Sequence, residues 1–127
     1  MKVLAISLIG LFLTMAGCKK SANTPESSIA LHHCLQAGAH ISLCFDSVVT
    51  ESRCPVNAEC VWAGYAACAF TLTHGDQQRS FVLATNNLMP GYAQDTVLLG
   101  CSVHLSDLFP YPGSGPAPVK AKVIFTH

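Results

Sequence analysis

Cysteine and histidine are the residues of this chain best suited to chemistry, because seven cysteines and six histidines occur among few charged residues. Thiolate sulfur and imidazole nitrogen are the usual protein ligands of zinc and copper. Five candidate ligands fall within 13 residues: His32, His33, Cys34, His40 and Cys44. Their spacing matches no common zinc motif, and adjacent histidines on a strand point to opposite faces. We therefore hold a metal site as an alternative only, and expect no cofactor.

The first 18 residues have the pattern of a secretion signal that ends at a cysteine. Lys2 precedes an apolar run over residues 3–15, which is short for a membrane span and typical of a signal's hydrophobic region. The run ends in Met15-Ala16-Gly17-Cys18, which resembles the lipobox of bacterial lipoproteins, where the cysteine is diacylated and becomes the first residue. Several acyl chains on one residue anchor a protein durably. We therefore predict a cleaved signal over 1–17 and a lipid on Cys18.

Removing Cys18 from the count leaves six cysteines, an even number that favours disulfides in an exported domain. They are Cys34, Cys44, Cys54, Cys60, Cys68 and Cys101. Cys54 and Cys60 are separated by only five residues, among them Pro55 and Asn57, so they can close a small loop, and we predict a disulfide between them.

Three pairings of the other four cysteines remain possible. Strand alternation places Cys68 and Cys101 among core-facing residues, whereas Cys44 faces away from Leu43 and Phe45. We therefore predict the disulfides Cys34–Cys44 and Cys68–Cys101.

The elements that must position these residues look like short strands. Residues 19–28 are small, polar and aperiodic, which predicts a flexible tether before a single domain over 29–127. Strand-like stretches follow at 40–49, 61–73, 79–84, 96–105 and 119–126. The last has the clearest alternation, with Val119, Ala121, Val123 and Phe125 on one face. About six short strands predict an all-β fold, a small antiparallel sandwich or barrel.

One segment joins several of these features. It reads Glu51-Ser52-Arg53-Cys54-Pro55, then four residues, then Cys60-Val61-Trp62-Ala63-Gly64. It is either an exposed binding hairpin or a structural clasp, in which Arg53 pairs with Glu51 or Asp46. We favour the clasp, because a sole tryptophan beside a disulfide usually packs in the core. Truncating a core Trp62 to alanine is then expected to cost about 3–5 kcal/mol.

This segment resembles a signature of small uncharacterised bacterial lipoproteins, D-S-R-C-P-x4-C-x-W-x-G, with glutamate at position 51 in place of aspartate. The stretch Leu105-Ser106-Asp107-Leu108-Phe109-Pro110-Tyr111-Pro112 and the strand after it resemble the same family's ending. The resemblance implies a small all-β lipoprotein domain, with no established activity and no catalytic residues. It marks as motif residues Glu51, Arg53, Pro55, Trp62 and Gly64. The four cysteines outside Cys54 and Cys60 are not part of the signature.

The charge balance and the motifs argue against two classes of function, nucleic-acid binding and catalysis. The mature chain would carry six basic and seven acidic residues, so we expect no nucleic-acid partner. Gly113-Ser114-Gly115 lacks the spacing of a nucleophile elbow, and no glycine-rich phosphate loop occurs, so we expect no enzyme. We expect a non-catalytic binding or structural module in the bacterial cell envelope. A lipid would hold it on the outer membrane, facing the periplasm or the cell surface.

The partner of such a module would be an envelope protein or a glycan. A zinc- or copper-binding lipoprotein that uses the His32–Cys44 cluster is the first alternative. A peptidase-inhibitor-like module, which presents loops from a rigid sandwich, is a weaker one.

Overall fold

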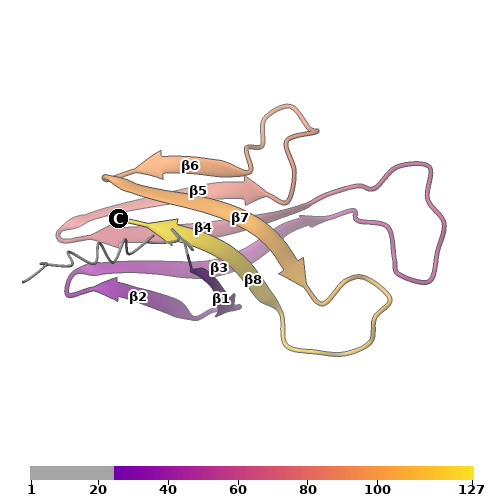
Figure 1. The fold of residues 1–127 in the computed structure, drawn as a ribbon, viewed down its shortest axis with the longest axis horizontal. Helices are drawn as coiled ribbons and strands as arrows, with labels where there is room; N and C mark the ends of the chain where they lie inside the picture. Colours follow the sequence, from indigo (N-terminus) through magenta and orange to yellow (C-terminus); the bar gives the residue numbers. More distant parts are fainter. Residues whose placement is uncertain (1–24) are drawn as a thin grey trace, which may run out of the picture.

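A computed structural model describes residues 25–127, so the predicted signal, Cys18 and most of the expected tether lie outside the described residues. The described chain forms eight strands in two four-stranded antiparallel sheets, ordered β1-β8-β7-β6 and β2-β3-β4-β5 (Figure 1). The strands are β1 (Glu26–Ala30), β2 (Cys34–Gly38), β3 (Ile41–Glu51), β4 (Ala66–His74), β5 (Gln77–Ala84), β6 (Asp95–Leu98), β7 (Cys101–Phe109) and β8 (Lys120–Thr126). Residues 25–127 contain no helix that is long and apolar enough to cross a membrane. The predicted all-β antiparallel sandwich is confirmed.

The strands differ from the sequence prediction in number and at several boundaries. The first strand begins at Glu26, inside the segment expected to be tether, because Glu26–Ala30 pairs along Ile124–Lys120 of β8. β2 was also missed, because five-residue strands show little alternation of their own. The single strand expected over 96–105 is wrong: Leu99 and Gly100, both with positive φ, form a turn that divides it into the antiparallel pair β6 and β7. These additions account for eight strands rather than about six. The strand expected over 61–73 begins only at Ala66, which leaves residues 61–65 in a loop.

The core lies between the sheets and follows the alternation of the sequence. Phe45, Phe70 and Phe81 stand side by side across β3, β4 and β5, with ring centroids 5.3 and 5.8 Å apart. The opposite sheet contributes inward residues from β7 and β8, such as Val103 and Val123, which are fully buried. Each sheet thus covers the apolar face of the other, as a sandwich requires.

Two of the three predicted disulfides are present. Cys34 and Cys44 lie directly opposite each other in the register of β2 and β3, and their sulfurs are bonded. The Cys54–Cys60 disulfide closes the short loop after β3, with Cα atoms 5.8 Å apart.

The predicted Cys68–Cys101 disulfide is wrong, because both cysteines are buried and free. Both face the core, as alternation indicated, but they lie at opposite ends of the sandwich. Cys101 begins β7 beside the end of β4, where His74 Nδ1 lies 2.9 Å from the carbonyl oxygen of Leu99. Cys68 lies six residues before His74 on β4, and six extended residues span roughly 20 Å.

We expect the folded domain to hide both thiols from reagents. Each is fully buried, and burial raises the pKa of the Cys68 thiol to about 12 and also raises the pKa of Cys101. Little reactive thiolate therefore forms at Cys68 below that pH. Free thiols can be titrated without reductant on protein whose Cys18 is blocked by its lipid. The titration should find almost no reactive thiol in the native state and two thiols per chain after denaturation. Finding none after denaturation would restore the third disulfide.

Three long connections meet at one end of the sandwich, which we call the loop end: residues 52–65, 85–94 and 110–119 (Figure 1). Hydrogen bonds join them to one another. The amide of Val56 donates to the carbonyl of Pro112, and the Asn86 side chain donates to the carbonyl of Gly64. β1 begins away from this end, where Glu26 pairs with Ile124 near the C-terminus.

Candidate functional site

Arg53 is the one charged residue buried in the described chain, and it holds the loop end together. Its side chain is only 6% exposed. Nε and Nη2 donate to the two carboxylate oxygens of Glu51, at 2.8 and 2.7 Å, which is the two-pronged pairing that a guanidinium favours. Nη1 donates to the carbonyl of Leu108 at 2.6 Å and to Asp107 Oδ1 at 3.2 Å. Arg53 therefore fastens the 52–65 loop to the end of β7.

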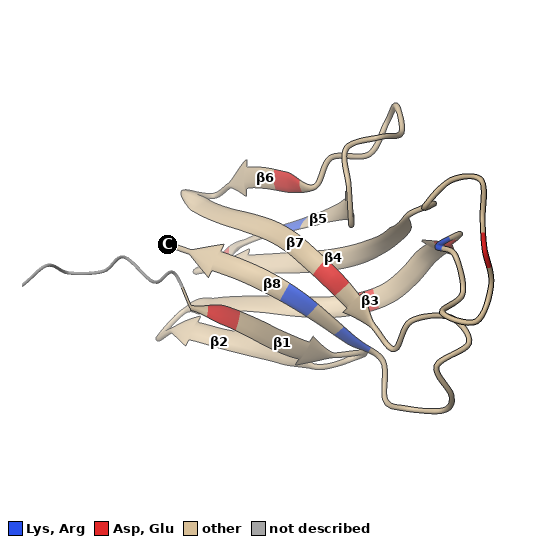
Figure 2. Ribbon diagram, turned by 45° about the vertical axis from the view of Figure 1, so that its right-hand side comes forward, with Lys and Arg blue, Asp and Glu red and all other residues tan. Residues whose placement is uncertain are grey.

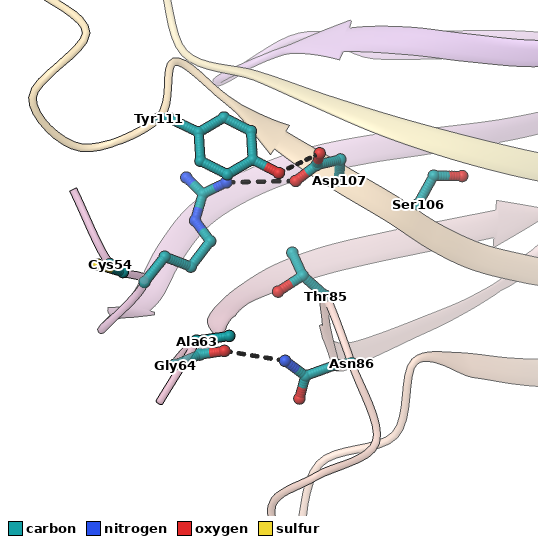
Figure 3. A pocket seen from close by; sticks show the side chains of 9 residues that line it. Cys54, Ala63, Gly64, Thr85, Asn86, Ser106, Asp107 and Tyr111 are labelled. Atoms are coloured by element: carbon teal, nitrogen blue, oxygen red, sulfur yellow. Dashed lines mark hydrogen bonds and ion pairs between the residues drawn. The ribbon is translucent and has the colours of Figure 1, made fainter. Parts of the chain in front are cut away.

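Tyr111 closes this cluster from the third loop. The Arg53 guanidinium carbon lies 4.3 Å from the centre of the Tyr111 ring, and the Tyr111 hydroxyl donates to Asp107 Oδ2 at 2.6 Å (Figure 3). That hydrogen bond, followed by burial, raises the pKa of Tyr111. Burial alone would lower the pKa of Arg53, but the hydrogen bond and charge of Glu51, with the charge of Asp107, raise it overall. The guanidinium thus stays charged.

The sequence named one of the two acidic partners of Arg53. Glu51 pairs with it, whereas the alternative Asp46 accepts a hydrogen bond from Thr71 Oγ1 at 2.6 Å instead. Sequence reasoning missed Asp107, which lies 54 residues from Arg53. The only signal for Asp107 was that the stretch around it is part of the family resemblance. Nothing in that stretch indicated that Asp107 pairs with Arg53.

Gly64 and Pro55 shape the same loop. Gly64 has φ +65°, and a Cβ there would lie 1.9 Å from the carbonyl oxygen of Ser52, so only glycine permits this close approach of two backbone segments. The carbonyl of Pro55 accepts a hydrogen bond from the amide of Ala58, which turns the chain toward Cys60. Together with the disulfide, these contacts make residues 52–65 a closed loop fixed at its base.

Trp62 does not lie in the core, so that prediction is wrong. It is 78% exposed, and its neighbour Val61 is fully exposed. The physical reason is that residues 61–65 are a loop rather than the start of β4, while Phe45 and Phe70 fill the core between the sheets. The tightly anchored loop therefore carries the sole tryptophan of the chain outward.

Replacing Trp62 with alanine should change the free energy of unfolding by less than about 1 kcal/mol, because substitutions of exposed side chains usually have small effects. Denaturant unfolding measured by circular dichroism would test this without relying on tryptophan emission. The wild-type emission should also resemble that of indole in water and be quenched readily by acrylamide. A loss of several kcal/mol would instead place the side chain in a packed site.

A pocket of about 320 Å³ lies beside Trp62. It is formed by the end of β3, the 52–65 loop and the 85–94 loop. The lining residues are Thr50, Ser52, Trp62, Ala63, Gly64, Tyr65, Asn86, Leu88 and Met89. None is charged, and apolar and aromatic side chains predominate, as in many ligand sites.

A second pocket, of about 360 Å³, lies beside the Arg53 cluster, and Asn86 lines both (Figure 3). Asn86 Nδ2 donates to the carbonyl of Gly64 at 2.9 Å, and its Oδ1 accepts from the amide of Leu88 at 3.1 Å. This asparagine fixes two of the loops against each other, so both pockets have preformed walls.

The metal cluster that the sequence offered as an alternative is not assembled. Cys34 and Cys44 are bonded to each other, so neither sulfur is a thiolate, and His33 Nδ1 lies 3.0 Å from the carbonyl oxygen of Leu31. Within residues 25–127, no three side chains of histidine, cysteine, aspartate or glutamate are grouped as a metal site. His32 and His40 therefore have no common centre to bind.

No protein-family model, curated protein or solved structure matches the chain. The resemblance to small bacterial lipoproteins accordingly stays a prediction.

Proposed function

We propose that the protein is an envelope-anchored, non-catalytic module that binds its partner through the loop end. The observation that carries this proposal is the exposed Trp62, held outward on a loop that the Cys54–Cys60 disulfide and the Arg53 cluster fix in place. Tryptophan is among the residues that contribute most at binding interfaces. A preformed loop also loses little entropy when it binds.

The position of β1 supports the anchoring part of the proposal. A tether that enters β1 at Glu26 joins the sandwich away from the loop end, because Glu26 pairs near the end of β8. A lipid on Cys18 would thus hold the domain by one end and present Trp62 at the other. The two disulfides are also consistent with an oxidising compartment.

We expect Cys18→Ser to abolish acyl labelling and to leave the precursor uncleaved or cleaved elsewhere, because the thiol is the group that receives the lipid. Metabolic labelling with a fatty-acid analogue and mass measurement of the mature N-terminus would test this. Cys34→Ser is a suitable control, because its label should match the wild type. Undiminished labelling of Cys18→Ser would contradict the anchor.

The binding role can be tested in intact cells with a photo-crosslinking residue at single positions. Placed at Trp62, it should yield a discrete adduct, whereas at Val97, which is 73% exposed on β6, it should yield none. Absence of an adduct at position 62, or equal adducts at both positions, would contradict binding at the loop end. A peptidase in the adduct would favour the inhibitor-like form of the module.

A further inference from the structure

The loop end is almost free of charge. Its three connections, residues 52–65, 85–94 and 110–119, contain only Arg53 and Glu59 as charged residues. Arg53 is buried, which leaves Glu59 as the one exposed charge in these loops, while most other charges lie on the strands (Figure 2). A surface without cationic side chains does not attract phosphates or anionic lipid headgroups.

Exposed apolar side chains gather in the same region, from two loops that are distant in sequence. Val61 and Trp62 come from the 52–65 loop, and Leu88, 76% exposed, and Met89 come from the 85–94 loop. Trp62, Leu88 and Met89 line one pocket. Depletion of charge with enrichment in aromatic residues and methionine is the composition of the buried centre of a protein–protein interface.

Two of the polar side chains that line the pocket, Ser52 and Asn86, form hydrogen bonds with its own walls. Ser52 Oγ donates to the carbonyl of Tyr65 at 3.0 Å and accepts from the amide of Tyr65 at 3.2 Å. Asn86 is held in the same way, between Gly64 and Leu88. A saccharide needs several donors and acceptors around its hydroxyls, whereas an apolar side chain needs none. The further polar side-chain groups among the lining residues are few: the hydroxyls of Thr50 and Tyr65 and the indole N–H of Trp62. The pocket thus favours an apolar occupant.

From these three observations we propose that the pocket between Trp62 and Leu88 binds an uncharged, apolar peptide segment of a partner protein, with a large side chain in the cavity. At about 320 Å³ the pocket is at the small end of ligand sites, so it suits one anchoring side chain. Flexible Met89 can adjust to that side chain. This inference rests on the proposed function and names the class of partner.

The test is a selection of random peptides displayed on phage, against the full mature protein held by its lipid in nanodiscs. Nanodiscs that carry the Trp62→Ala protein serve as a counter-selection, which removes phage that bind the lipid or other surfaces of the protein. We expect peptides rich in leucine and aromatic residues and poor in charged ones. A synthetic peptide of the consensus sequence should shift the emission of Trp62, which is the sole tryptophan of the chain.

Calorimetry on variants then locates the binding. Trp62→Ala should lower the affinity for the peptide by about tenfold or more, and Leu88→Ala should lower it by a smaller factor. Such losses are expected for residues at the centre of an interface. Val97→Ala, an exposed aliphatic residue on β6, should leave the affinity unchanged. Because all three side chains are exposed, the variants should fold like the wild type.

Four outcomes would overturn the inference: no enrichment over Trp62→Ala, charged consensus peptides, emission shifts with neutral oligosaccharides instead of peptides, or Trp62-dependent self-association in sedimentation. The last two would assign the pocket to a glycan and to a second copy of the chain. An adduct at position 62 in cells with no selected peptide would leave the proposed function standing and remove only the class of partner.

Discussion

Arg53→Ala is expected to lower the free energy of unfolding by about 3–5 kcal/mol, the usual cost of removing one partner from a buried ion pair. The change deletes the bonds to Glu51, Asp107 and the carbonyl of Leu108, and it removes the group beneath Tyr111. The carboxylates of Glu51 and Asp107 would then repel each other with no cation between them. Because these bonds fasten the 52–65 loop to the end of β7, the loss should also loosen the loop end.

Denaturant unfolding would measure this effect, with Arg79→Ala as the matched control. Arg79 is the only other arginine of the sequence, and it is exposed. Within residues 25–127 its side chain donates one hydrogen bond, to the neighbouring carbonyl of Gln78. Arg79→Ala should therefore cost less than about 0.5 kcal/mol. Arg53→Lys should retain the charge but lose the two-pronged bond to Glu51, and should fall between the two. Equal losses for both alanine variants would contradict a structural role for the Arg53 cluster.

Gly64→Ala should cost about 3 kcal/mol, from two separate effects. A residue with a side chain at φ +65° is strained by about 1–2 kcal/mol. The added Cβ would also lie 1.9 Å from the carbonyl oxygen of Ser52, which must move because it belongs to the backbone. Forcing such a shift in a packed site typically costs another 1–3 kcal/mol or so.

Gly75→Ala separates the two effects. Gly75 has a similar φ of +61°, but a Cβ there would meet no atom within 4 Å, so only the conformational cost of about 1–2 kcal/mol applies. Thermal or denaturant unfolding of both variants should show Gly64→Ala clearly less stable than Gly75→Ala. Equal destabilisation would mean that the 52–65 loop can move aside, and would weaken the view that it is preformed for binding.

Local patterns of the sequence were enough for the fold class and for two of the disulfides. Alternation in the strands requires one buried face per sheet, and it correctly placed Cys68 and Cys101 in the core. Cys54 and Cys60 are close in sequence, and Cys34 and Cys44 lie in neighbouring strands of one sheet. Such short-range relations depend on strand period and chain length, which the residues themselves specify.

Tertiary structure alone decided the rest. Alternation tells which face a residue occupies but not its position along the sandwich, so it could not show that Cys68 and Cys101 lie at opposite ends. The pairing of Arg53 with Asp107 spans 54 residues and exists only because the end of β7 meets the 52–65 loop. Trp62 lies outside because Ala66, not Val61, begins the strand, and the phenylalanines of the sheet already fill the core. Long-range packing, which no local pattern encodes, therefore determined where the proposed binding surface lies.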